Sequence, residues 1–147
     1  TITNPADFRR YTTRKFKFNF GSDVPLIRTA EMILIDAEAL ARTPGKEAEA
    51  HDLLYALQKN RDVNAVKSTN TGAALIDEIL LERRKELYAE NGVEWFDAKR
   101  LRKGITRTGN HRIFKNLSAD DKRFFLKVPQ SEIDANESID DTVNKDR

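Results

Sequence analysis

The sequence contains no cysteine among its 147 residues. This absence excludes disulfide bonds, thiolate metal sites and thiol nucleophiles, but it does not identify the compartment, because secreted proteins can also lack cysteine. Long hydrophobic runs are missing too. The apolar run from Met32 to Ile35 ends at Asp36, far short of the roughly 20 residues that a membrane-spanning helix needs. No such helix is therefore predicted.

Side chains that carry out catalysis or bind metals are equally scarce. The two histidines, His51 and His111, are about sixty residues apart, and neither has a second ligand at a metal-binding spacing. No serine lies in the Gly-x-Ser-x-Gly setting of an exposed nucleophile, and the six glycines form no phosphate-binding motif. The sequence therefore predicts no enzyme, no cofactor and no metal site.

One pair of acidic residues has a spacing that catalysis could use. Glu82 and Glu86 are one helical turn apart, and paired carboxylates can bind a cation or divide the acid and base roles. Their neighbours Arg83 and Arg84 favour a different interpretation, an ion-pair network that holds this helix to its partners. We assign no catalytic role to the pair.

Charge is almost balanced overall but uneven along the chain. The net charge is +2, yet the segment from Lys99 to Lys127 has ten Lys or Arg against two Asp, and Gln130 to Arg147 has six acids against two bases. A basic stretch before an acidic tail is compatible with a nucleic-acid module that masks itself. Solvated loops are the simpler interpretation, and no nucleic-acid partner is predicted.

The N-terminal part predicts one strand and a helical hairpin. Arg14 to Phe20 alternates polar and apolar residues as a half-buried strand does. From Leu26 to Arg42 the apolar residues follow helical spacing, with Asp23 as the expected cap and Pro25 near the first turn. The break at residues 43–45 leads into a second helix, which must pack antiparallel to the first.

A second hairpin is predicted from the next two helical segments. A long helix runs from residue 71 to Asn91-Gly92, with Tyr88 on its buried side, and a shorter one runs from Val93 to Arg102 and buries Phe96. From Gly104 onward only turns and a short extended piece are expected, and the final polar tail is expected to be disordered.

These elements predict a mainly α fold of antiparallel, tetratricopeptide-like helical hairpins, with one N-terminal strand and a long irregular C-terminal segment. The expected divisions are a strand and its leading segment at 1–25, helical hairpins at 26–103, an irregular segment of the same domain at 104–136, and a polar tail at 137–147.

Trp95 is the weak candidate for ligand contact. An exposed indole can stack on a sugar ring or a base, and Lys99, Arg100 and Arg102 follow it. Its neighbour Phe96 and its place at a helix start favour burial in the core instead.

Three blocks of the sequence resemble the SusD/RagB family. The first, Pro25 to Ala39, is similar to the family's PLIRLAEMYLIRAEA helix. The second, from Glu82 to Arg100, resembles its ERRxEL…G…WFDLxR signature, and Val128-Pro129 begins a block similar to its closing IPxxEIxxNP. The positions that carry the resemblance are Arg28, Glu31, Glu38, Glu82, Arg83, Arg84, Glu86, Gly92, Trp95, Asp97, Arg100 and Pro129.

The sequence departs from the family pattern at two places. Glu94 stands where members usually have an arginine, so the local ion pairing is expected to differ. Asn136-Glu137 replaces the closing Asn-Pro. Neither position is one to which we assign a function.

The resemblance implies the C-terminal portion of an outer-membrane nutrient-binding lipoprotein of a Gram-negative cell. Such a protein faces outward, is held by a lipid anchor that this chain does not include, and partners a SusC-like TonB-dependent transporter. It binds an oligosaccharide or another nutrient and breaks no bond. The contact residues vary among members, so the resemblance assigns none. The alternative is a tetratricopeptide-like adaptor that binds a peptide between its hairpins.

Overall fold

The computed structural model describes residues 15, 21, 23–108 and 116–145. Within this part the protein is mainly helical, which confirms the predicted fold class. The elements are α1 (Thr29–Ala41), α2 (Glu47–Arg61), α3 (Gly72–Glu86), α4 (Val93–Arg100), η1 (Lys122–Phe124), α5 (Gln130–Ala135) and η2 (Asp141–Asn144), the two η elements being 3-10 helices. The strand predicted at Arg14 to Phe20 lies outside the described residues apart from Lys15.

The chain divides into two compact units. The first unit is Asp23–Glu94, and the second contains Thr1–Ser22 and Trp95–Arg147, so the chain passes between the units within the first turn of α4. Each unit has a hydrophobic cluster of its own.

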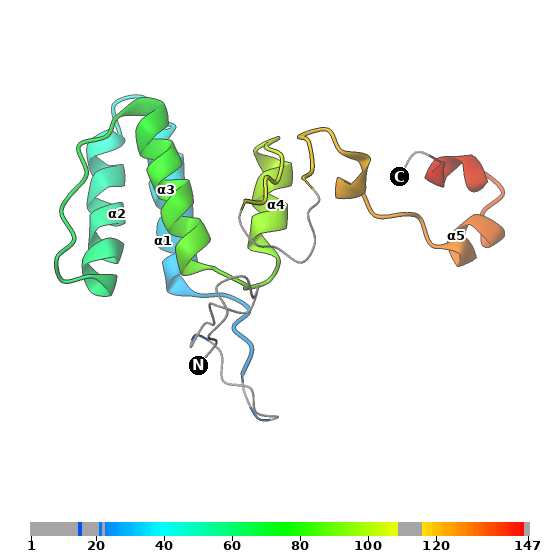
Figure 1. Ribbon diagram of the computed structural model, residues 1–147, viewed down its shortest axis with the longest axis horizontal. Coiled ribbons are helices and arrows are strands. Elements are labelled where there is room, and N and C mark those ends of the chain that lie inside the picture. Colours follow the sequence, from blue (N-terminus) through cyan, green and yellow to red (C-terminus); the bar gives the residue numbers. More distant parts are fainter. Residues whose placement is uncertain (1–14, 16–20, 22, 109–115, 146–147) are drawn as a thin grey trace. The chain divides into compact units, whose positions relative to one another are not determined.

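The first unit is a bundle of three helices. Figure 1 shows α1 and α2 joined by a tight turn as an antiparallel hairpin, with α3 beside α1 and antiparallel to it. Gly45 makes the turn possible with a φ of +78°, a conformation that costs a glycine little. The packing of α3 on α1 is a contact that the prediction of two separate hairpins did not contain.

All three helices of this bundle contribute to its core. Leu34 of α1, Leu54 of α2, and Leu75 and Ile79 of α3 are at most 1% exposed. Burying each such side chain stabilises the fold by about 1.5–3 kcal/mol relative to leaving it in water. Small residues of α1 let the neighbouring helices approach closely. They are Ala30, Ala37 and Ala41.

Helix α1 begins later than predicted. Arg28 is extended, with φ −131° and ψ 145°, and Asp23 does not cap the helix. The side-chain amide of Asn91 donates to the carbonyl oxygens of Pro25 and Leu26, at 3.1 and 2.9 Å. These contacts hold the preceding segment outside the helix, so the first helical residue is Thr29.

Helix α3 ends at Glu86, five residues before the predicted stop at Asn91. The Arg28 guanidinium donates to the Glu86 carbonyl oxygen at 2.6 Å, which satisfies one of the carbonyls left open at a helix end. Ala89 and Asn91 then adopt positive φ values of 57° and 45°. Tyr88, predicted to be buried, lies beyond the helix and is 58% exposed.

The second unit packs around Phe124, which is 2% exposed. An isolated antiparallel bridge joins Ile105 to Leu117, and both side chains are buried beside that of Ala98 from α4. The prediction that Phe96 is buried was wrong, because its side chain is 63% exposed. Successive residues of a helix point about 100° apart, so Phe96 and Ala98, which are two positions apart, point to nearly opposite sides of α4. Helix α4 also ends at Arg100, two residues early.

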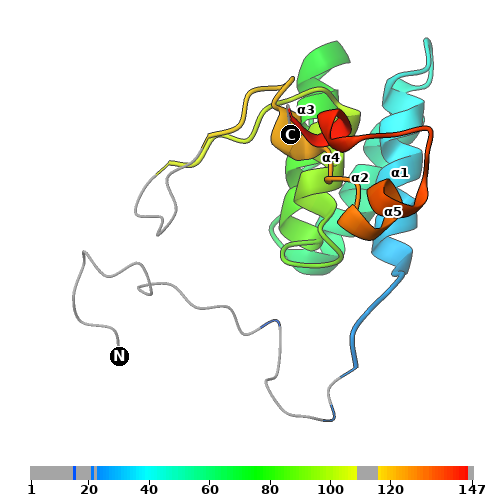
Figure 2. The same cartoon turned by 90° about the vertical axis from the view of Figure 1, so that its right-hand side faces the viewer.

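The C-terminal part is more ordered than predicted. Figure 2 shows α5 in orange and the last turn, η2, in red. The Asn144 side chain accepts from the backbone N–H of Val128 and donates to its carbonyl oxygen, each at 2.9 Å. Ile133 of α5 is buried. The described residues up to 145 therefore do not form the disordered tail that was expected.

Candidate functional site

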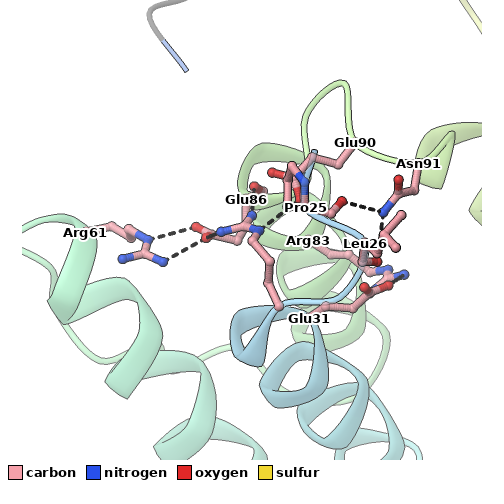
Figure 3. Close-up of polar contacts among 9 residues, drawn as sticks. Pro25, Leu26, Glu31, Arg61, Arg83, Glu86, Glu90 and Asn91 are labelled. Atoms are coloured by element: carbon pink, nitrogen blue, oxygen red, sulfur yellow. Dashed lines mark hydrogen bonds and ion pairs between the residues drawn. The ribbon is translucent and has the colours of Figure 1, made fainter. Parts of the chain in front are cut away.

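The residues that the sequence singled out divide between the two units. In the first unit, charged side chains gather where α1 begins and where α2 and α3 end (Figure 3). We call this group the ion-pair cluster. It consists of Arg28, Glu31, Arg61, Arg83, Glu86 and Glu90.

Glu86 is the centre of the ion-pair cluster. Arg61 donates to both of its carboxylate oxygens, at 2.9 and 2.8 Å, and Arg28 donates to one of them at 2.8 Å. The Glu86 side chain is only 8% exposed. Hydrogen bonds from Arg61 and Arg28 hold the pKa of Glu86 below its usual value, although burial alone would raise it.

Arg28 joins the start of α1 to the chain that follows α3. Besides contacting Glu86, it donates from Nε to the buried Glu90 at 2.9 Å. Burial alone would lower the pKa of Arg28, but its hydrogen bonds to Glu90 and Glu86 raise it above its usual value. Arg28 is therefore a fixed cation that connects two segments about sixty residues apart.

Other charged residues of the signature also form ion pairs. Arg83 donates to Glu31 at 3.0 Å, which connects α3 to α1. Arg84 pairs with Glu94 at 2.7 Å. Glu94, the acidic residue that departs from the family pattern, is thus paired with an arginine of α3.

Two predicted positions form ion pairs within their own helix or just beyond its end. Glu82 pairs with Lys85 at 3.4 Å and makes no contact of this kind with the arginines beside it. Glu38 is buried in α1 and accepts from Arg42, one turn later, at 2.8 Å. Gly92 has a φ of +68° in the turn before α4.

Trp95, Asp97, Arg100 and Pro129 belong to the second unit. Trp95 is half-buried and lies against Phe124, with ring centroids 4.7 Å apart and planes tilted by 48°. Asp97 accepts from Arg100 on the same helix at 3.1 Å. Pro129 comes directly before α5, and its carbonyl oxygen accepts the first helical hydrogen bonds.

Sequence reasoning missed three participants of this region, which are Arg61, Glu90 and Asn91. Arg61 was not singled out from the sequence, and Asn91 was interpreted only as a helix end. Both interact with residues distant in sequence. The one local signal was the helical spacing of Leu54, Leu57 and Arg61, which does not identify a distant partner.

The ion-pair cluster has the properties of a structural clamp. The hydrogen bonds that lower the pKa of Glu86 favour its ionised form, which makes it a poor general acid. Among the described residues, no group of three or more His, Cys, Asp or Glu side chains is arranged to hold a metal ion. No helix in that same part is long and apolar enough to cross a membrane.

Comparison with known proteins was made at the level of families, curated proteins and solved structures. The sequence model of the SusD family matches residues 9–144. The chain belongs to the SusD family. Neither the curated proteins nor the solved structures gave a match.

Membership of the SusD family confirms the resemblance found in the sequence. The family consists of binding proteins that take part in nutrient uptake. The match includes every residue of the ion-pair cluster as well as Trp95 and Pro129. It does not distinguish the residues that maintain the SusD fold from those that contact a ligand.

Proposed function

We propose that this SusD-family chain is part of a protein that binds an oligosaccharide or another nutrient at the outer-membrane surface. The protein then delivers the nutrient to a SusC-like TonB-dependent transporter. The observation that carries the proposal is the family match over residues 9–144. Outward-facing attachment through a lipid anchor completes the proposal.

The ion-pair cluster supports a role in binding rather than in reaction. Its carboxylates are engaged by arginines that come from several segments, Arg28 and Arg61 among them. Such pairs fix the geometry of a scaffold, and the hydrogen bonds that lower the pKa of Glu86 favour its ionised form. We therefore propose capture of the nutrient without bond cleavage.

Calorimetric titration of the chain with a panel of neutral and acidic oligosaccharides tests ligand binding. Saturable binding to at least one oligosaccharide is expected, with the sugar recovered unchanged by mass spectrometry. Binding to none of them, together with tight binding to an extended peptide, would favour the helical adaptor instead. Recovery of a cleaved sugar would contradict the absence of catalysis.

Cell fractionation tests the location and the transporter partner. The protein carrying this chain, affinity-tagged and expressed in its own host, should be cleaved when intact cells are treated with protease. It should also co-purify with a barrel transporter after mild detergent extraction. Protection from protease in intact cells would overturn the surface location, and purification without any barrel protein would overturn the partner.

A further inference from the structure

The second unit carries an aromatic and basic surface that the ion-pair cluster does not involve. Phe124 and Phe125 are adjacent, but Phe124 is buried against Trp95 whereas Phe125 is 53% exposed. The ammonium group of Lys99, on α4, lies 4.7 Å from the centroid of the Phe125 ring. Leu126 extends the apolar surface and is 86% exposed. We call Lys99, Phe125 and Leu126 the stacking surface.

The acidic side chains nearest in sequence to this surface already have cationic partners. Asp97 pairs with Arg100 at 3.1 Å, and Asp121 pairs with Arg123 at 2.5 Å. Lys99 forms no ion pair within the described part of the chain, and its one interaction there is with the Phe125 ring. The ammonium group thus keeps donors for an external anion.

The segment of the sequence that contains this surface is predominantly basic. The stretch from Lys99 to Lys127 carries ten basic residues and two acidic ones. An aromatic ring can stack on the apolar face of a sugar, while a neighbouring ammonium group binds a carboxylate or sulfate. A neutral sugar would use the ring but would offer the ammonium group no anionic partner.

We propose that the stacking surface binds acidic sugars, so that the ligand of this protein is a uronic-acid or sulfated oligosaccharide. The inference rests on the proposed function and names the class of glycan within it. In this arrangement, Phe125 and Leu126 contact the sugar ring, and Lys99 binds its negative group. Salt screens the attraction between Lys99 and this negative group, so binding is expected to weaken as salt rises.

The test compares two ligands that differ in charge but have the same sugar ring. The full chain is titrated calorimetrically with oligogalacturonate and with its methyl ester, which is neutral. Oligogalacturonate is expected to bind about tenfold more tightly, and the difference should shrink as salt rises. Equal binding of the two would overturn the inference while leaving the proposed function intact. Binding of neither overturns the inference, and failure of the whole oligosaccharide panel overturns the function as well.

Substitutions locate the binding surface. Lys99→Gln and Phe125→Ala should each weaken oligogalacturonate binding by about tenfold, whereas Lys99→Arg keeps the cation and should bind nearly as well as the parent chain. Lys145→Gln is the matched control, because it removes the same charge from an exposed position elsewhere in the unit, and it should change the affinity by less than about twofold. Equal weakening by Lys99→Gln and Lys145→Gln would overturn the assignment to this surface.

Titration with a nucleic acid distinguishes recognition of a sugar from general attraction to a polyanion. Single-stranded oligothymidylate offers a similar charge and aromatic bases that can stack. Weaker binding of oligothymidylate than of oligogalacturonate supports the inference. If oligothymidylate binds more tightly and depends equally on Lys99 and Phe125, the surface is a nucleic-acid site and the proposal is wrong. Circular dichroism of each variant establishes that it is folded before it is titrated.

Discussion

At the residue scale, Glu86 connects three segments of the first unit. It extends from the last turn of α3 and accepts from Arg61 of α2 and from Arg28 before α1. Its carboxylate is nearly inaccessible to water, so these contacts are screened less by solvent and salt than those of an exposed ion pair. Removal of the charge would leave two guanidinium groups facing a neutral partner.

The substitution Glu86→Gln is therefore expected to lower the free energy of unfolding of the first unit by about 2 kcal/mol. Urea unfolding at pH 7, followed by far-UV circular dichroism, measures the change. Glu49→Gln is the matched control because Glu49 pairs with Lys46 on the exposed surface of the same bundle. Its expected cost is about 0.5 kcal/mol or less. Equal costs for the two substitutions would contradict a central role for Glu86.

The lowered pKa of Glu86 predicts a dependence of stability on pH. Since the folded pKa lies below the unfolded value of 4.5, the unfolded chain binds the proton more readily in the intervening range. The stabilisation is complete above about pH 4.5 and is lost as the pH falls through the folded pKa. Urea midpoints of the parent chain should drop more steeply below that pH than those of Glu86→Gln. Parallel profiles would contradict the assignment.

At the element scale, α1 has one face in the core and another exposed. Leu34 is fully buried, whereas its neighbour Ile35 is 48% exposed. Leu34→Ala is expected to lower the free energy of unfolding by about 2–5 kcal/mol, since it leaves a cavity among three helices. Ile35→Ala should cost no more than about 0.5 kcal/mol. Urea unfolding of the two variants compares them, and similar costs would mean that Ile35 is also covered in solution.

The bridge in the second unit depends on a glycine. A Cβ atom at Gly104 would lie 2.2 Å from the Leu117 carbonyl oxygen, and that oxygen accepts the bridge hydrogen bond from Ile105 at 2.9 Å. Gly104→Ala should therefore displace the bridge and cost about 1–3 kcal/mol. Trp95 fluorescence during urea unfolding reports the loss. Gly21→Ala is the control, because nothing lies within 4 Å of its added Cβ.

At the scale of the whole molecule, the two units each bury a hydrophobic cluster. Trp95, the only tryptophan, lies in the second unit, whereas circular dichroism is dominated by α1, α2 and α3, the longest helices. We expect the two signals to give different urea midpoints, which a single two-state transition would not produce. Leu34→Ala should shift the circular-dichroism midpoint alone. Coincident transitions in every variant would show that the units unfold together.

Helical spacing predicted the hairpin of α1 and α2, because apolar residues that recur every three or four positions require a common partner. It also predicted where α3 begins. It could not predict where α1 begins or α3 ends, since those limits depend on Asn91 binding the Pro25 carbonyl and on Arg28 binding the Glu86 carbonyl. The local spacing of apolar residues does not identify partners that are about sixty residues away.

The candidate site, like the fold, could be predicted only in part from the sequence. Three sequence blocks, including the signature from Glu82 to Arg100, indicated the family, because the order and spacing of their residues can be read from the sequence. The sequence did not identify Arg61 as the bidentate partner of Glu86. It also assigned Phe96 to the core, although the aromatic residue that fills the core beside Trp95 is Phe124.

The sequence by itself determined the family, the mainly helical class and the absence of cysteine chemistry, because these follow from residue types and their spacing. The tertiary structure alone decided which charges meet, where helices end and which aromatic residues face water. The physical reason is that ion pairs, caps and burial depend on distances between segments that are far apart along the chain. One exposed ring, Phe125 beneath Lys99, now gives the proposed function a surface on which it can be tested.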